Sequence, residues 1–161
     1  MPEPPPAEDP DVDLHLPAHR AELRSGRASL LGAVALGGAL GAGARYGVTL
    51  LWPTPHGGFP WAVACVNTAG CALIGVFMVL HEELGSPHRL LRPFVGVGVL
   101  GGFTTFSTYA ADTRTLLAAG RPLVALADLA AVPLLALAAV AVSARVTRAC
   151  VARIRNAEGA R

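Results

Sequence analysis

The sequence predicts an all-α membrane protein with four transmembrane helices, and three observations support this fold class. Hydrophobic residues make up 53% of the 161 residues and charged residues only 15%, whereas soluble domains carry about 25% charge. The apolar residues gather in four runs, residues 29–51, 60–80, 93–117 and 122–144. Each run has roughly the 20 residues that a helix needs to cross a hydrocarbon core about 30 Å thick.

The first run, residues 29–51, is rich in glycine and contains one charged residue, Arg45. Its glycines are Gly32, Gly37, Gly38, Gly41, Gly43 and Gly47. Small residues let neighbouring helix backbones approach closely in a membrane, so we interpret this run as a packing helix. Arg45 lies in its outer half, where a charge is costly. Arg45 either extends to the outer interface or anchors a neighbouring helix and adds positive potential near an anion vestibule.

The second run, residues 60–80, contains Asn67 among apolar neighbours. An amide at this depth needs partners, and it finds them either in an interhelical hydrogen bond or by facing a pore as a donor. Cys65, Cys71 and Cys150 have a spacing that fits no metal site. We interpret them as packed, reduced thiols.

The third run, residues 93–117, contains a glycine pair followed by hydroxyl residues at mid-membrane. Non-helical backbone survives there only if it is buried in protein or lines a polar cavity, and its carbonyls are good cation ligands. We therefore predict a third helix that is broken at its centre, over Gly101 to Thr105. Phe106 and Tyr109 share a helix face. They either pack in the core or present their positive ring edges to a small anion.

Two acidic residues fall within the predicted helices. Asp112 lies near the outer end of the third run, where we expect a hydrated carboxylate. Asp128 lies deeper, in the fourth run. A carboxylate there repels an anion and attracts a cation or a proton, and both a structural and a functional interpretation of Asp128 remain open.

The arginines predict one fixed orientation. Ten of them lie on the side of the two termini and of the second connector, and two lie on the opposite side, Arg114 and Arg121. By the positive-inside rule both termini are cytoplasmic, and we expect the plasma membrane of a prokaryote. We predict that residues 1–28 form a disordered polar tail. Residues 29–144 then form the transmembrane domain, and residues 145–161 form a basic tail.

Composition also argues against several classes of protein. The net charge of +2 gives no support for nucleic-acid binding. We find no titratable catalytic pair and no nucleotide-binding loop, so we expect neither an enzyme nor an ATP-driven transporter.

Three blocks taken together resemble the Fluc (CrcB-type) family of fluoride channels. They are the glycine-rich stretch 37–46 ending in Arg45 and Tyr46, the stretch 66–70 with Asn67, and the stretch 98–109. The last block is the most specific of the three. The resemblance covers about residues 29–144.

The resemblance implies a dimer of two oppositely oriented subunits with two narrow pores, through which fluoride leaves the cytoplasm passively. It implies a structural Na⁺ at the dimer interface, held by backbone carbonyls that here belong to Gly101 and Thr104. The pore-lining positions implied by the family's motifs, or supplied by nearby hydroxyls that can replace water around fluoride, are Asn67, Phe106, Tyr109, Ser107 and Thr108, with Arg45 as the characteristic arginine.

The sequence departs from the family at several pore positions. Tyr109 replaces the second pore Phe, and Val63 replaces a second-helix Thr. Two fourth-helix pore positions align weakly with Asp128 and Val132. A homodimer needs the same chain inserted both ways, which a strong arginine bias opposes. We therefore hypothesise a heterodimer with a paralogous subunit of reverse bias, beside the homodimer.

Two other functions stay open. One is a non-conducting partner subunit, favoured by the departures in the fourth helix. The other is a cation/proton antiporter of the small multidrug-resistance kind, which requires an acid in the first helix that this sequence lacks.

Overall fold

The computed structural model describes residues 27–85 and 88–159, so the predicted tail 1–28 lies almost wholly outside the described residues. Within that part of the chain, four helical stretches are long and apolar enough to cross a membrane, which confirms the predicted all-α fold with four candidate spans. The elements are α2 (Ala28–Leu51), α3 (Trp61–Leu84), η2 (Arg92–Leu100), α4 (Gly101–Phe103), α5 (Ser107–Ala118) and α6 (Pro122–Gly159).

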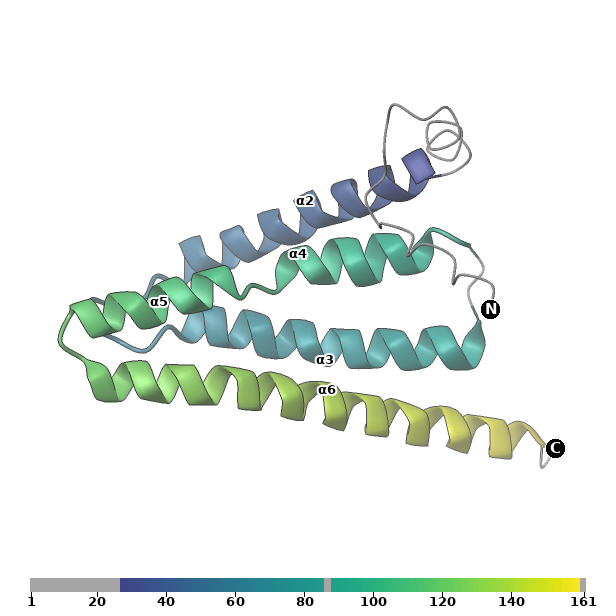
Figure 1. Cartoon of the computed structure of the whole chain (residues 1–161). Helices are drawn as coiled ribbons and strands as arrows, with labels where there is room; N and C mark the ends of the chain where they lie inside the picture. The colour runs from purple at the N-terminus through teal and green to yellow at the C-terminus, as the bar shows by residue number, and fades with distance from the viewer. Residues whose placement is uncertain (1–26, 86–87, 160–161) are drawn as a thin grey trace, which may run out of the picture.

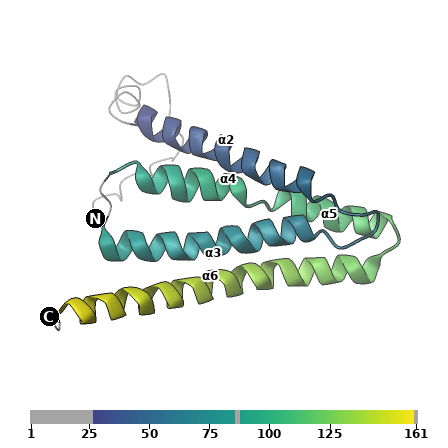
Figure 2. The same cartoon turned by 180° about the vertical axis from the view of Figure 1, so that it is seen from behind.

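The helices lie lengthwise beside one another and alternate in direction (Figure 1). The beginning of α2 and the end of α6 lie at one end of the molecule, and the turn between α5 and α6 lies at the other (Figures 1 and 2). In both views α3 lies between η2–α4 and α6. The span of α3 is 39% buried and that of α2 only 11%, so α3 is the central helix.

Glycine allows α2 to pack backbone against backbone on η2 and α4. A methyl group on Gly98 would lie 2.9 Å from the Cα of Gly37. A methyl group on Gly41 would lie 2.7 Å from the amide nitrogen of Phe103 and would overlap the carbonyl oxygen of Val99. These distances are shorter than van der Waals contact, so the packing interpretation of the glycine run is confirmed at Gly37 and Gly41.

The third span changes its helical geometry twice. η2 is wound as a π-helix and continues into the α-helical turn α4. Thr104 then adopts an extended conformation with φ −76° and ψ 156°, and α5 begins only at Ser107. The span therefore leaves helical geometry between Phe103 and Ser107 (Figure 1).

The predicted position of this irregular segment needs a correction. We expected it over Gly101 to Thr105, but Gly101, Gly102 and Phe103 are helical. Gly102 lies against the backbone of Gly38 in α2, so its missing side chain serves helix packing and does not unwind the chain. The residues between α4 and α5 are Thr104 to Phe106, of which Thr104 is extended and Phe106 already has helical φ and ψ.

A tight turn joins α5 to α6. Gly120 has a φ of 68°, in the left-handed region that favours glycine. The N–H of Arg121 donates to the carbonyl of Leu116, and the N–H of Gly120 to the carbonyl of Leu117. These two bonds form a Schellman motif, which ends α5. Pro122 then begins α6, where its missing N–H is not needed.

The last helix is longer than its apolar run. α6 has 38 residues, about 57 Å at roughly 1.5 Å per residue. The predicted basic segment 145–161 therefore continues the helix as far as Gly159. Arg148 pairs with Glu82 and Arg155 with Glu83 at the end of α3.

Candidate functional site

A groove of about 410 Å³ lies where α3, the segment from α4 to α5, and α6 meet. Three of the predicted pore residues, Asn67, Phe106 and Tyr109, line it. Both residues expected to offer carbonyls to a cation, Gly101 and Thr104, line it as well. The other lining residues are Cys71, Thr105, Val132, Pro133 and Ala136.

Asn67 holds the non-helical segment through both ends of its amide. Its Nδ2 donates to the carbonyl of Thr105 at 2.9 Å, and its Oδ1 accepts from the N–H of Thr105 at 2.8 Å. The pair of bonds fixes which amide atom is oxygen, because the reverse assignment would satisfy neither. Asn67 therefore makes an interhelical hydrogen bond, and the bond to Thr105 uses one of the two hydrogens on Nδ2.

Two contacts of Thr105 take helical donors away from backbone carbonyls in the third span. Because the N–H of Thr105 donates to Asn67, it does not complete the helical bond to the carbonyl of Gly101. The N–H of Thr108 donates to the Oγ1 of Thr105 at 3.2 Å, and so does not reach the carbonyl of Thr104. Neutral carbonyl oxygens without a helical donor are suitable ligands for a hard cation, so the residues fit the expected Na⁺ at Gly101 and Thr104.

The two aromatic residues lie in different environments. Tyr109 is only 6% exposed and packs in a cluster with Val63, Ala64 and Val132, as the core interpretation expected. Phe106 is 79% exposed, so core packing is wrong for that residue within this chain. The two ring centroids lie 5.6 Å apart with the ring planes inclined by 60°. The rings therefore form one wall of the groove with Phe106 at its open side.

The predicted hydroxyl donors are turned toward the irregular segment itself. The Oγ1 of Thr105 lies 3.3 Å from the hydroxyl of Ser107 and 3.1 Å from that of Thr108. Neither Ser107 nor Thr108 belongs to the lining of the groove. Within this chain the two hydroxyls accompany the start of α5, where Thr105 accepts a backbone N–H in the manner of a helix cap.

Arg45 connects α2 to the last helical turn before the irregular segment. Its Nε donates to the carbonyl of Gly102 at 3.3 Å. It does not line the groove. This contact has the geometry that the anchor interpretation of Arg45 requires. A cation near a helix C-terminus also interacts favourably with the helix dipole.

Asp128 lies outside the groove. It is fully buried, and its Oδ2 accepts a hydrogen bond of 2.7 Å from the hydroxyl of Thr113 in α5. Its Oδ1 is buried without a partner among the described residues. Of the two fourth-helix positions that align with the family's pore, Val132 lines the groove and Asp128 faces α5.

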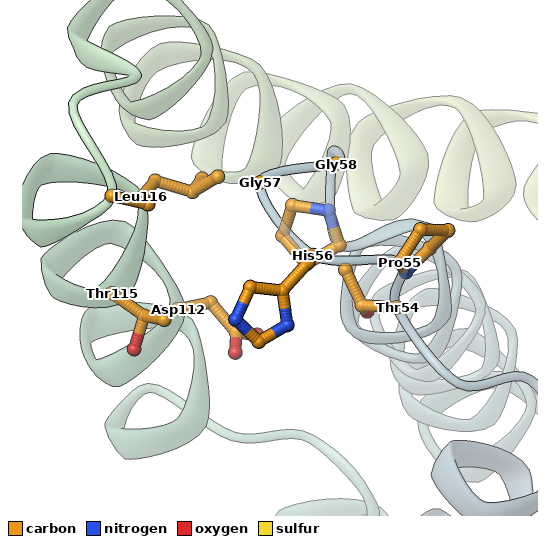
Figure 3. Close-up of a pocket in the computed structure, with 10 residues that line it drawn as sticks. Thr54, Pro55, His56, Gly57, Gly58, Asp112, Thr115 and Leu116 are labelled. Atoms are coloured by element: carbon orange, nitrogen blue, oxygen red, sulfur yellow. The ribbon is translucent and has the colours of Figure 1, made fainter.

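A second cavity, of about 230 Å³, lies at the end of the molecule where α5 turns into α6 (Figure 3). Figure 3 shows the imidazole of His56, from the connector after α2, beside Asp112 of α5. One carboxylate oxygen of Asp112 is buried without a partner in the described part of the chain, so Asp112 is less hydrated than we expected. None of the predicted pore residues lines this cavity, and it is not the candidate pore.

Four groove residues escaped the sequence analysis as lining residues: Cys71, Thr105, Pro133 and Ala136. Thr105 sits in the predicted break, but nothing in the sequence pairs it with Asn67. Cys71 is half-buried in the groove wall, although the sequence suggested only a packed thiol. Pro133 carried a usable signal, because a proline inside an apolar helical run removes one backbone donor.

Comparison with known proteins identifies the family of this chain. Residues 32–144 match the family described as CrcB-like protein, Camphor Resistance (CrcB). The chain is 53% identical over 131 residues to a Streptomyces avermitilis protein named Fluoride-specific ion channel FluC 2, covering 81% of this chain and 83% of the relative. It is 58% identical over 131 residues to Fluoride-specific ion channel FluC 1 of Streptomyces coelicolor, covering 80% and 85%. It is 54% identical to Fluoride-specific ion channel FluC 2 of Nocardia farcinica, covering 74% and 86%.

Proposed function

Since this chain belongs to the CrcB family of fluoride channels, we propose that it is a pore-forming subunit that lets cytoplasmic fluoride leave the cell passively. It is a multi-pass membrane protein and a channel, not an enzyme. The observation that most directly supports a pore is the groove, because it brings Asn67, Phe106 and Tyr109 together at mid-span. Loss of cytoplasmic fluoride through it would reduce fluoride toxicity.

The groove is half of a pathway, and a second subunit completes it. Phe106 lies at mid-span and is 79% exposed in the single chain. The groove beside it is lined by two polar residues, Asn67 and Thr105, and lipid offers polar groups no hydrogen-bond partner. A partner subunit in the opposite orientation would cover this face and leave a narrow pore between the two subunits.

Selectivity for fluoride follows from the groups that replace its water. Fluoride is small and strongly hydrated, so a narrow pore must supply donors at close range. Asn67 has one amide hydrogen that is not used by Thr105. The edges of the Phe106 and Tyr109 rings carry partial positive charge. These groups together suit a small anion better than a large one that cannot reach them at the same time.

A structural Na⁺ would be held by the carbonyls of Gly101 and Thr104 at the dimer interface. When bound, it supplies positive charge that joins the two irregular segments. In this proposal Asn67 keeps the carbonyl of Gly101 available by holding the N–H of Thr105 away from the helical position, and the Thr105 hydroxyl does the same for the carbonyl of Thr104 by accepting the N–H of Thr108. Arg45 supports the same region by holding the carbonyl of Gly102.

The arginines favour a heterodimer with an oppositely oriented paralogue. The described ends of α2, η2 and α6 that lie at one end of the molecule carry Arg27, Arg92, Arg145, Arg148, Arg153 and Arg155. The opposite end has Arg114 and Arg121. The bias favours insertion in one orientation with both termini cytoplasmic, so the inverted partner would be a related chain with the reverse bias.

A fluoride-efflux assay tests this function. The purified chain, alone and together with a paralogue, is placed in liposomes loaded with fluoride, and external fluoride is followed with a selective electrode. We expect flux from the pair and at least a tenfold lower flux after Phe106→Ile, because the ring edge at the groove is lost. Leu123→Ile, at an exposed position at the start of α6, is the matched control.

The outcomes separate the alternatives. Flux from the lone chain equal to that of the pair would exclude the heterodimer requirement. Flux from the pair that does not respond to Phe106→Ile would identify this chain as a non-conducting partner. A proton-coupled antiporter receives no support from the site, since Asp128 is buried against Thr113 and lies outside the groove.

A further inference from the structure

Pro133 leaves a carbonyl in the first third of α6 without its helical donor. A proline has no backbone N–H, so the carbonyl four residues earlier loses its helical donor. In α6 the proline is Pro133, and the carbonyl is that of Leu129. This position lies about 10 Å along the helix from Pro122 at roughly 1.5 Å per residue, within the span. No water is present at that depth to satisfy the carbonyl.

Tyr109 donates to that same carbonyl. Its hydroxyl lies 2.7 Å from the carbonyl oxygen of Leu129. We infer that the Tyr109 hydroxyl replaces the donor that Pro133 removes, and that this bond positions the Tyr109 ring as a wall of the pore. That the ring lines a pore rests on the proposed function, whereas the hydrogen bond between Tyr109 and Leu129 does not depend on it.

The bond decides which part of Tyr109 an ion can meet. Because the hydroxyl is committed to Leu129, the side chain offers its ring to the groove and not its O–H. The ring belongs to one buried cluster with Val63 and Ala64 of α3 and Val132 of α6. Tyr109 is therefore a positioning residue, since its donor acts on the helix and its ring is kept at the groove.

A second hydrogen-bonded contact between α5 and α6 lies one turn further along α5. The hydroxyl of Thr113 contacts both the carbonyl of Tyr109, at 3.1 Å, and the Oδ2 of Asp128, at 2.7 Å. Asp128 and Leu129 are adjacent in α6, so the hydrogen bonds from Thr113 and Tyr109 together fix the rotation of α5 against α6. This explains why a tyrosine can stand where the family has phenylalanine: in this chain α6 has an acceptor for its hydroxyl.

The test is a double-mutant cycle on thermal stability in detergent, using Tyr109→Phe, Pro133→Ala and the double variant. Tyr109→Phe leaves the carbonyl of Leu129 without a donor, and we expect the unfolding midpoint to fall by about 3–6 °C. Pro133→Ala restores the helical N–H. In that background Tyr109→Phe should cost less than about a third of its cost in the wild type. Equal costs in both backgrounds would overturn the inference.

Fluoride flux per folded protein, measured on the channel reconstituted with any partner it needs, separates positioning from stability. The double variant has no unpaired carbonyl but also no hydroxyl to hold the ring. We expect its stability to return to that of Pro133→Ala while its flux stays about threefold or more lower, since a site wall must be held within about 0.5 Å. Equal flux in the double variant and in Pro133→Ala would refute the positioning role.

Tyr46→Phe is the matched control. Tyr46 is the other tyrosine in the chain and is 62% exposed. Its substitution should leave the unfolding midpoint unchanged. If no preparation conducts fluoride, the proposed function fails while the stability cycle still confirms or refutes the hydrogen bond between Tyr109 and Leu129.

Discussion

The two halves of the molecule are held together by different means. On one side, α2 packs against η2 and α4 through glycines whose backbones touch, as at Gly37 and Gly98. On the other side, Asn67 of α3 bonds Thr105 of the irregular segment, and Tyr109 and Thr113 of α5 bond α6. The irregular segment between α4 and α5 lies where the two halves meet.

The difference teaches how a membrane protein can place polar groups without losing stability. Apolar contact between helices has little hydrophobic advantage over lipid, so close packing of small residues provides the rigid half. Asn67, Tyr109 and Thr113 then each have a defined partner at membrane depth, where lipid offers none. The glycine half acts as a fixed support, and the hydrogen-bonded half forms the groove.

The sharpest way to break the rigid half is Gly41→Ala. The added methyl group would overlap the carbonyl of Val99 and lie 2.7 Å from the amide nitrogen of Phe103, both backbone atoms that cannot rotate away. We expect a loss of at least about 3 kcal/mol of folding stability, at the upper end of overpacking costs. The measurement is the yield of monodisperse protein and its unfolding midpoint in detergent.

Gly43→Ala is the matched control for this experiment. A methyl group on Gly43 meets nothing within 4 Å, and alanine favours a helix over glycine by about 1 kcal/mol. We therefore expect Gly43→Ala to fold at least as well as the wild type. If Gly41→Ala is as stable as Gly43→Ala, then α2 is not held by close backbone contact.

The two halves also differ in how far the sequence predicts them. Glycines in an apolar run predict close packing because the rule depends only on residue size. Four spans follow in the same way from length and hydropathy, and both predictions are confirmed. Even so, the glycines Gly101 and Gly102 misled us about the start of the irregular segment, because small size can serve packing as well as unwinding.

The hydrogen-bonded half is harder to predict. Asn67 is recognisable as a polar group in need of a partner, but the partner, Thr105, is 38 residues away. Nothing in the local sequence connects Tyr109 to Leu129 or Thr113 to Asp128. These pairs depend on the rotation of each helix about its axis, which the packing of the whole bundle sets and no single run contains.

Asn67→Ala breaks the hydrogen-bonded half at its most connected residue. It removes the partner of both the N–H and the carbonyl of Thr105. Two half-buried backbone groups without partners should cost about 2–4 kcal/mol together. We expect a lower unfolding midpoint and loss of fluoride flux, measured on the same reconstituted preparation.

The adjacent residue provides the control. The hydroxyl of Thr68 bonds the carbonyl of Ala64 within its own helix at 2.7 Å, and that carbonyl also accepts the helical N–H of residue 68. Thr68→Val should therefore cost less than about 1 kcal/mol. Similar losses for Thr68→Val and Asn67→Ala would mean that a general polar effect, and not the bond to Thr105, explains the result.

The smallest expected effect sharpens the comparison at the cytoplasmic end that we propose for α3 and α6. Arg155 pairs with the carboxylate of Glu83 at 2.7 Å and also donates to its backbone carbonyl at 2.6 Å, but both side chains reach solvent. Exposed ion pairs contribute about 0.2–1 kcal/mol. Glu83→Gln keeps the backbone bond, so we expect a loss below about 1 kcal/mol that disappears at about 1 M salt, where charges are screened within about 3 Å.

Glu82→Gln should cost still less, because Arg148 lies 3.7 Å from a more exposed carboxylate. A loss from Glu83→Gln that persists in high salt would show that this end is held by more than charge. The long α6 would then stabilise the bundle as strongly as the buried bonds of Tyr109 and Thr113 do.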